Sequence, residues 1–260
     1  MAWAQSTAVM DAHLTKKERL DQAVVSRGLA PSRARARDLI HRGFIKVDGA
    51  PCLKPSTGVM PAQSVLLSAD APTYVSRGAE KLVSALDAFA FDATDRIALD
   101  VGASTGGFTQ VLLERGAARV YAVDVGHGQL RAAVSNDRRV VALEGTDARA
   151  LDRQCVPDPI SAIVADVSFI SLGKALPAAL ALAAPQAWLV ALIKPQFEAG
   201  PDHVGRGGIV RDVAIQQRVV SEIEAWLTAQ SGWTIQGVVS SPILGGSGNA
   251  EFLIGATFRG

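Results

Sequence analysis

The chain has 260 residues, of which 48% are hydrophobic and 20% are charged, which indicates a soluble globular protein with a substantial core. Its net charge is only +1, but residues 1–78 carry 11 Lys and Arg against 6 Asp and Glu, so this part is the candidate polyanion-binding region. The two cysteines, Cys52 and Cys155, lack the spacing of a metal site or a disulfide framework. We therefore expect reduced thiols and no bound metal, as in a cytoplasmic protein.

The N-terminal residues and the most apolar segment of the chain are the two candidates for membrane-targeting signals. Lys16 and Lys17 follow a weakly apolar start instead of preceding an apolar core, so no secretory signal is expected and 1–14 is predicted to be a flexible tail. The Ala- and Leu-rich segment 175–193 has the length of a membrane span, but two prolines divide it. It predicts a short helix, a turn and the buried strand 188–193, and no stable membrane association.

Residues 15–70 are predicted to form a small α+β domain. Thr15 and Glu18 have the spacing of a capping box, which predicts a first helix, and a second helix is predicted to begin at Ser32. The run 44–49 then predicts a strand that ends in an Asp-Gly hairpin turn. Two short helices and a hairpin are close to the smallest unit that folds independently.

This domain resembles the RNA-binding fold of the ribosomal-protein-S-four type, also called the alpha-L motif. The resemblance covers roughly 18–67 and rests on four motifs: Arg19-Leu-Asp21, Ser32-Arg33, Ile40 and Gly43-Phe-Ile-Lys-Val-Asp-Gly49. It implies that the second helix and the adjoining loop contact structured RNA through phosphates, which orient the protein without reading sequence. The candidate RNA contacts are Arg19, Arg33, Arg35, Arg37, Arg42 and Lys46. For any one arginine, a solvated surface charge is an equally good interpretation.

After a linker at 71–78, the region 79–260 alternates strand-like and helical runs. The predicted strands are 97–101, 120–123, 140–143, 160–165, 188–193, 233–239 and 251–258. This alternation predicts an α/β sheet covered by helices on both faces. The connection 240–250 is too short for a helical crossover, so the last two strands are expected to be antiparallel neighbours. Such a terminal hairpin resembles the class I (Rossmann-like) methyltransferase sheet.

The segment from Ile97 to Phe108 is typical of a cofactor-binding turn, because an apolar strand stops at a carboxylate and a small-residue turn opens a helix. Asp124 ends the next strand, where an acid can hold a ribose hydroxyl pair, and Asp147 is placed to face an adenine. A structural tight turn and an exposed loop acid are the simpler alternatives. The candidate cofactor contacts are Asp100, Gly102, Ser104, Thr105, Gly106, Gly107, Phe108, Asp124, Asp147 and Asp166.

Four ionisable residues are the candidate catalytic groups. Asp166 and Lys194 end the fourth and fifth strands, where a charged side chain is costly to bury without a function. Lys81 precedes the sheet and Glu251 begins the last strand. An exposed helix lysine and an edge-strand charge that opposes aggregation are the alternatives for these two residues.

Five further motifs resemble the TlyA, or hemolysin A, family, and with the N-terminal domain the resemblance covers nearly all of 18–258. The motifs are Ser104-Thr-Gly-Gly-Phe-Thr109, Asp124-Val-Gly-His-Gly-Gln-Leu130, Ala165-Asp-Val-Ser-Phe-Ile-Ser-Leu172, Lys194-Pro-Gln-Phe-Glu198 and Ser247-Gly-Asn-Ala-Glu-Phe252. This family belongs to the FtsJ-like ribosomal RNA methyltransferases. The resemblance implies methyl transfer from S-adenosylmethionine to a cytidine ribose 2′-oxygen in ribosomal RNA, free or in ribosomal subunits, and no DNA binding. The family's Lys-Asp-Lys-Glu tetrad maps onto Lys81, Asp166, Lys194 and Glu251.

A ribose hydroxyl must lose its proton as its oxygen attacks a methyl carbon, and a lysine can assist only where its surroundings lower its pKa. We expect Lys194 to face the hydroxyl, with Lys81, Asp166 and Glu251 positioning it. Enzymes that methylate exocyclic amines usually have Asn/Asp-Pro-Pro-aromatic after the fourth strand. The sequence Asp166-Val-Ser-Phe here favours an oxygen acceptor.

Three other functions are compatible with parts of the sequence. A nicotinamide-dependent oxidoreductase would use a similar sheet, but the glycine spacing and the terminal hairpin disfavour it. A membrane-lytic hemolysin would need a membrane span or a strongly amphipathic basic helix, which the sequence does not offer. A catalytically silent RNA-binding protein that assists ribosome assembly would bind RNA without methyl transfer.

Overall fold

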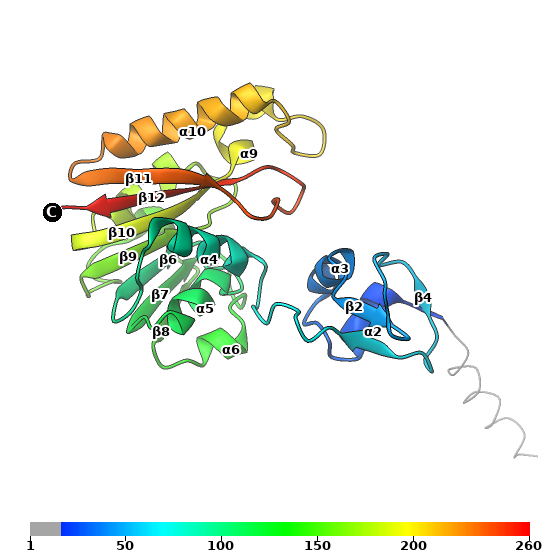
Figure 1. Ribbon diagram of the computed structural model, residues 1–260. Helices are drawn as coiled ribbons and strands as arrows, with labels where there is room; N and C mark the ends of the chain where they lie inside the picture. The colour runs from blue at the N-terminus through cyan, green and yellow to red at the C-terminus, as the bar shows by residue number, and fades with distance from the viewer. Residues whose placement is uncertain (1–16) are drawn as a thin grey trace, which may run out of the picture. The chain divides into compact units, whose positions relative to one another are not determined.

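The computed structural model describes residues 17–260, so the tail predicted at 1–14 and the capping residue Thr15 lie outside the described residues. The chain divides into two compact units, one that extends to Thr73 and one from Tyr74 to Gly260 (Figure 1). Cys52 and Cys155 are both free thiols. No helix within 17–260 is long and apolar enough to cross a membrane, and no cluster of side chains there could hold a metal ion.

Between residue 17 and Thr73, the first unit contains two helices and five short strands. Its elements are β1 (Glu18–Arg19), α2 (Leu20–Ser26), α3 (Arg33–His41), β2 (Ile45–Val47), β3 (Ala50–Pro51), β4 (Gly58–Val59) and β5 (Val65–Leu67). Strand β2 pairs with β3 and β5, and β1 pairs with β4, all antiparallel. The Asp-Gly turn predicted between β2 and β3 is confirmed, since both residues have positive φ.

The two helices of this unit begin at residues that are set by the contacts just before them. The predicted start of the second helix is confirmed, because Ser32 is the N-cap of α3 and its Oγ accepts a hydrogen bond from Arg35 N. The predicted start of the first helix is wrong: Glu18 pairs with Val59 in β1, and α2 begins only at Leu20. Tertiary strand pairing therefore overrides the capping-box pattern. Buried side chains from both helices and from β2 form the core: Leu20, Val24, Leu39, Ile40 and Ile45.

The second unit is built around a seven-stranded sheet. Its strands are β6 (Ile97–Val101), β7 (Arg119–Asp124), β8 (Val140–Glu144), β9 (Ile160–Ala165), β10 (Ala183–Ile193), β11 (Trp233–Ser240) and β12 (Phe252–Phe258). They lie in the order β11-β12-β10-β9-β6-β7-β8. The five strands β6 to β10 are parallel, whereas β12 is antiparallel to both of its neighbours. The predicted sheet and its antiparallel last strand are confirmed.

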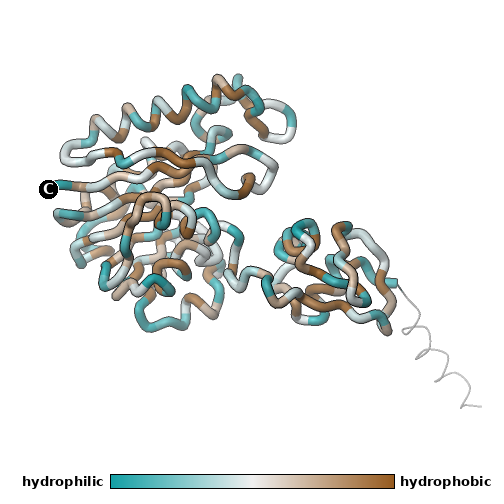
Figure 2. The backbone as a smooth tube through the Cα atoms, in the orientation of Figure 1, coloured by the Kyte–Doolittle hydropathy of each residue, from teal (hydrophilic) through white to brown (hydrophobic). Residues whose placement is uncertain are grey.

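Helices cover both faces of this sheet. They are α4 (Gly78–Phe89), α5 (Gly107–Glu114), α6 (Ala132–Ser135), α7 (Leu172–Ala175), α8 (Pro177–Leu180), α9 (Pro195–Glu198) and α10 (Val213–Thr228), with two 3-10 turns at Ala148–Ala150 and Pro201–His203. Neighbouring strand residues point to opposite faces, so Ala98 packs in the core under α4 and α5, and Leu99 in the core under α10. Figure 2 shows hydrophobic residues concentrated along the strands, while α10 alternates hydrophobic and hydrophilic residues.

The order of the strands determines where a ligand can bind. After β6 the chain continues to β7 on one side, whereas β9 pairs on the other side of β6. This reversal leaves a crevice between the loops that follow β6 and β9 at the carboxyl ends of the strands. The two loops meet there, since Asp166 N donates a hydrogen bond to Val101 O over 2.9 Å.

Candidate active site

A cavity of about 240 Å³ opens at this end of the sheet. It is lined by residues before and within α4, by the turn after β6, and by the ends of β9 and β10: Ser76, Arg77, Gly78, Lys81, Gly102, Ala103, Ser104, Thr105, Gly107, Phe108, Asp166, Ser168 and Lys194. A second cavity of about 380 Å³ shares Gly102, Ser104, Asp166 and Ser168 with it and extends to Asp124 and Asp147. The two cavities therefore meet at the turn after β6.

The glycines of the turn after β6 lie very close to neighbouring residues. Gly102 has φ +86°, and a Cβ there would lie 2.7 Å from the Asp166 carbonyl oxygen. Gly106 has φ +93°, and a Cβ there would lie 2.9 Å from Leu130. No other residue fits either position without displacing its neighbour, because a side chain would clash and the backbone conformation would be strained. The two glycines thus allow the turn to pack tightly against the residues around it at the start of α5.

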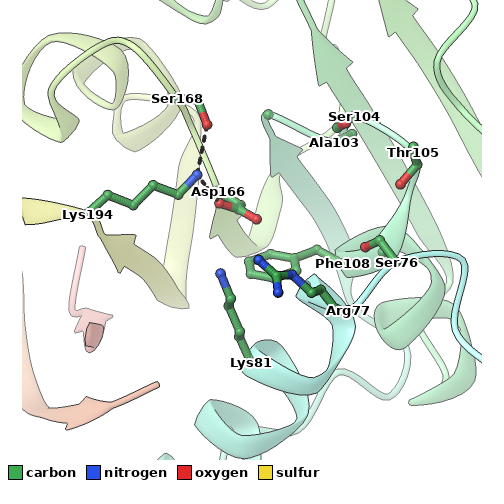
Figure 3. Close-up of a pocket in the computed structure, with 13 residues that line it drawn as sticks. Ser76, Arg77, Lys81, Ala103, Ser104, Thr105, Phe108, Asp166, Ser168 and Lys194 are labelled. Carbon is green, nitrogen blue, oxygen red and sulfur yellow. Dashed lines mark hydrogen bonds and ion pairs between the residues drawn. The ribbon is translucent and has the colours of Figure 1, made fainter. Parts of the chain in front are cut away.

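Lys194 is anchored at the end of β10. Its Nζ donates a hydrogen bond to Ser168 Oγ over 2.9 Å and lies 2.6 Å from Asp166 Oδ1 in an ion pair. Asp166 Oδ1 is buried and accepts no aligned hydrogen bond from any described residue, so charge attraction holds this pair. Only 10% of the Lys194 side chain is exposed. Figure 3 shows Lys194 and Lys81 entering the cavity from different elements, with Asp166 drawn between their amines.

Lys81 on α4 is held by Glu251, which directly precedes β12. The two side chains are almost fully buried, and Lys81 Nζ lies 2.5 Å from Glu251 Oε2. Glu251 Oε1 accepts a hydrogen bond from Gln196 Nε2, and a Cβ at Gly245 would overlap the same carboxylate oxygen. Lys81, Asp166 and Lys194 line the same cavity, whereas Glu251 lines neither cavity and joins the group only through its ion pair with Lys81.

The acids predicted to bind a cofactor differ in their surroundings. Asp124 lines the larger cavity, and its oxygens accept hydrogen bonds from Ser104 N and Gly126 N. Asp147 lines the same cavity and caps the following turn. Hydrogen bonds from Arg149 lower the pKa of Asp147 to about 2, so this carboxylate stays ionised near neutral pH.

Asp100 does not line either cavity. Its side chain is fully buried at the end of β6, and Thr109 Oγ1 donates a hydrogen bond to Oδ2 over 2.6 Å. Burial raises the pKa of Asp100 to about 7, with smaller contributions from the negative charges of Asp166 and Asp124, against the lowering effect of the Thr109 hydrogen bond. Asp100 therefore connects β6 to α5 beneath the turn. Gly106 likewise lies outside both linings, whereas Ser104, Thr105, Gly107 and Phe108 line the smaller cavity.

Several lining residues were not predicted from the sequence. Ser76 and Arg77 enter the cavity from the segment that starts α4, and Ser168 binds the Lys194 amine. Phe169 lines the larger cavity with a φ of +65° and 90% of its surface exposed, and its ring packs against Phe197. The motif Asp166-Val-Ser-Phe contained Ser168 and Phe169, but their roles depend on side-chain directions that spacing does not give.

The candidate RNA contacts in the first unit differ in their exposure and in their partners. Arg19, Arg33 and Arg37 have half-exposed side chains that all bind the buried carboxylate of Asp21. Arg35 is instead buried and binds Asp38 Oδ2 and the carbonyl of Pro72. Arg35 is therefore not available at the surface, in contrast to the prediction. The remaining two are Arg42, whose guanidinium lies over the Phe44 ring, and Lys46 in β2.

The comparisons with known proteins agree with this architecture. Residues 74–258 match the model of the FtsJ-like methyltransferase family, and residues 18–62 match the S4 domain. The chain is 46% identical over 242 residues to the 16S/23S rRNA (cytidine-2′-O)-methyltransferase TlyA of Mycobacterium tuberculosis, covering 93% of this chain and 90% of the relative. It is 39% identical over 236 residues to Hemolysin A of Brachyspira hyodysenteriae, covering 90% and 98%.

A solved structure extends the likeness to three dimensions. The Streptococcus thermophilus protein described as a "putative hemolysin" superimposes with a TM-score of 0.74 at 38% identity, covering 94% of this chain and 90% of that one. The likeness therefore extends over both units of this chain. The chain belongs to the TlyA/hemolysin A family of FtsJ-like methyltransferases with an N-terminal S4 domain.

Proposed function

We propose that this protein transfers a methyl group from S-adenosylmethionine to the ribose 2′-oxygen of a cytidine in ribosomal RNA. The observation that carries the proposal is that Lys81, Asp166 and Lys194 line one cavity beside the glycine turn, with Lys194 paired to Asp166 and Lys81 paired to the buried Glu251. The 46% identity to a protein described as a 16S/23S rRNA (cytidine-2′-O)-methyltransferase supports the acceptor and the reaction.

The residues around the two cavities fit the methyl donor. Gly102 lines both cavities, and its lack of a side chain lets the turn pack directly against the Asp166 backbone beside them. Asp124 would hold ribose hydroxyls, and Asp147 would lie at the adenine end of the larger cavity. When bound, S-adenosylmethionine supplies an electrophilic methyl group on a sulfonium.

Lys194 is the group that we assign to the acceptor hydroxyl. Its amine donates a hydrogen bond to Ser168 Oγ and lies beside Asp166 in an ion pair, so both residues fix its position. The amine also lines the cavity where the 2′-hydroxyl would lie. Lys194 orients this hydroxyl and, with its amine in the uncharged form, receives the proton as the oxygen attacks the methyl carbon. Glu251 holds the amine of Lys81, which lines the same cavity, so the acceptor would enter an environment whose charges are already arranged.

The S4 domain supplies the binding of the polynucleotide. Its exposed arginines suit contacts with phosphates, which position an RNA without selecting a base. DNA lacks the 2′-hydroxyl and cannot be the acceptor. We therefore propose that ribosomal RNA, free or within a ribosomal subunit, is the partner, and that the protein acts in the cytoplasm, where ribosomes assemble, without stable membrane association.

Incubation of the purified full-length chain with S-adenosylmethionine carrying an isotopically labelled methyl group tests the proposal. Purified 16S and 23S RNA and assembled small and large subunits serve as acceptors, and nuclease digestion followed by mass spectrometry identifies the modified nucleoside. The proposal predicts labelled 2′-O-methylcytidine. Label on a nucleobase, or RNA binding without any label, would contradict it, and the latter result would favour a silent assembly factor.

A further inference from the structure

Asp21 connects three of the candidate RNA-binding arginines. It lies in the first turn of α2, and its side chain has no exposed surface. Arg19 approaches it from β1, whereas Arg33 and Arg37 approach from α3, where they stand one turn apart. One buried carboxylate thus joins arginines from two separate elements.

The contacts leave most of each guanidinium unused. Arg19 donates through Nε to Asp21 Oδ1 over 3.0 Å and through Nη2 to Oδ2 over 3.4 Å. Arg33 Nη2 and Arg37 Nε donate to Oδ2 over 2.8 Å and 3.1 Å. A guanidinium has five N–H donors, so every arginine keeps several for a ligand. The three side chains remain 45%, 47% and 50% exposed.

The charge of this cluster is positive and permanent. Burial raises the pKa of Asp21, but the hydrogen bonds from Arg19, Arg33 and Arg37 lower it further, and the net result lies well below the ordinary range. Asp21 is therefore ionised at neutral pH. Three guanidiniums against one carboxylate leave a net charge of two, which suits an anion with several oxygens such as a phosphodiester backbone.

We propose that Asp21 is a positioning residue that holds Arg19, Arg33 and Arg37 as one preformed phosphate-binding cluster for the RNA backbone. This inference rests on the RNA-binding role that we propose for the S4 domain. A free arginine side chain loses rotamer freedom when it binds a ligand, whereas one already held by a carboxylate loses less. Asp21 therefore strengthens RNA binding although its own charge repels the RNA.

The sign of this effect separates positioning from simple electrostatics. Asp21→Asn removes a negative charge from a surface that meets a polyanion, so charge alone predicts tighter binding. Positioning predicts that binding weakens by about tenfold. The dependence of affinity on salt concentration should keep its slope, since all three cations remain, whereas Arg33→Gln should reduce that slope by about one.

The experiment measures the affinity of the full-length protein for a fluorescent 16S RNA transcript between low and moderate salt. Asp70→Asn, an exposed acid in the same unit, is the matched control and should bind as the original protein does or slightly more tightly. Circular dichroism defines the temperature at which each variant is folded. Unchanged or tighter binding by folded Asp21→Asn would overturn the inference.

A double variant distinguishes positioning from a general structural role. In an Arg33→Gln/Arg37→Gln background, Asp21→Asn should no longer weaken binding, because little remains to position. An undiminished tenfold loss there would contradict the inference. If the arginine variants themselves bind RNA as tightly as the original protein does, the proposed RNA-binding role of the S4 domain fails instead.

If Asp21→Asn does not fold, single substitutions still test the cluster. Arg27 offers a control with equal charge, because its guanidinium donates to the carbonyls of Gln63 and Met60 rather than to Asp21. The inference predicts a loss of about tenfold for Arg33→Gln and for Arg37→Gln and little change for Arg27→Gln. Equal losses at all three positions would overturn it.

Discussion

Lys81 and Glu251 lie 170 positions apart in the chain, yet their side chains form an ion pair with Nζ and Oε2 2.5 Å apart. Their side chains are only 7% and 3% exposed. Water therefore solvates neither charge well, and each charge depends on the other for compensation. Helix α4 and the residue before β12 thus meet through a charged contact inside the protein. Such a pair is costly to form, and it specifies geometry better than it stabilises the fold.

Removal of one partner of this pair should destabilise the protein and abolish activity. Lys81→Met leaves Glu251 buried and unpaired, and the free energy of unfolding should fall by about 3 to 5 kcal/mol. Thermal or urea unfolding followed by circular dichroism measures this change. Arg115→Gln is the control: its pair with Asp87 is about half exposed, and the loss there should stay below about 1 kcal/mol.

The double variant Lys81→Met/Glu251→Gln should separate stability from function. Both side chains are then uncharged, so most of the lost stability should return, while methyl transfer stays absent. The Glu251→Gln substitution keeps a side-chain oxygen that can accept the hydrogen bond from Gln196 Nε2. If the double variant regained activity together with stability, the pair would serve the fold alone and its proposed catalytic role would be wrong.

Gly102→Ala should weaken binding of the cofactor product S-adenosylhomocysteine by at least about tenfold, because the new Cβ would press on the Asp166 carbonyl. Gly128→Ala is the matched control. Gly128 also has a positive φ, but no atom lies within 4 Å of the position that a Cβ would take there, so that variant carries the backbone strain without the clash. Isothermal titration calorimetry compares them, and equal affinities would exclude a close backbone approach at Gly102.

Asp100 should make stability depend on pH. Its pKa rises from an ordinary 3.8 to about 7 in the folded protein, chiefly through burial, so the folded state holds a proton that the unfolded state releases between these values. The stabilising effect of that proton is complete below pH 3.8 and is lost as pH rises through 7. Asp100→Asn does not titrate, and it should gain at least about 1 kcal/mol relative to the original protein between about pH 4 and pH 8. A difference that stays constant with pH would contradict the raised pKa.

Ser168→Ala should slow methyl transfer by about tenfold without weakening S-adenosylhomocysteine binding, because the Lys194 amine loses one of its two anchors. Ser168→Thr keeps the hydroxyl and should recover part of the rate. Single-turnover kinetics with ribosomal RNA provides the comparison. Equal rates for the alanine variant would mean that Asp166 alone positions Lys194.

The sheet could be predicted because buried strands follow simple patterns. Apolar runs end at an acid, as 97–99 does at Asp100 and 162–165 does at Asp166, and the short link before Phe252 excludes a helical crossover. The ends of the strands therefore located the site. The partners within it came from the family resemblance, since no spacing indicates that Lys81 meets Glu251.

The local details depended on contacts between distant residues. Arg35 lies on a helix rich in arginine, yet its guanidinium binds the carbonyl of Pro72, 37 positions later. Asp100 follows an apolar run like a ligand-binding acid, but Thr109 engages it beneath the turn. Asp21 was part of a motif used for the resemblance, and its role as the common partner of three arginines is visible only in three dimensions.

Lys194→Ala provides the most direct test of the proposed chemistry. The variant and the original protein are incubated with ribosomal RNA and labelled S-adenosylmethionine, and 2′-O-methylcytidine is quantified by mass spectrometry alongside S-adenosylhomocysteine and RNA affinities. We predict that both affinities are retained and that methyl transfer falls by at least about 100-fold. Methylation at the original rate by the folded variant would show that Lys194 does not activate the acceptor and would contradict the account.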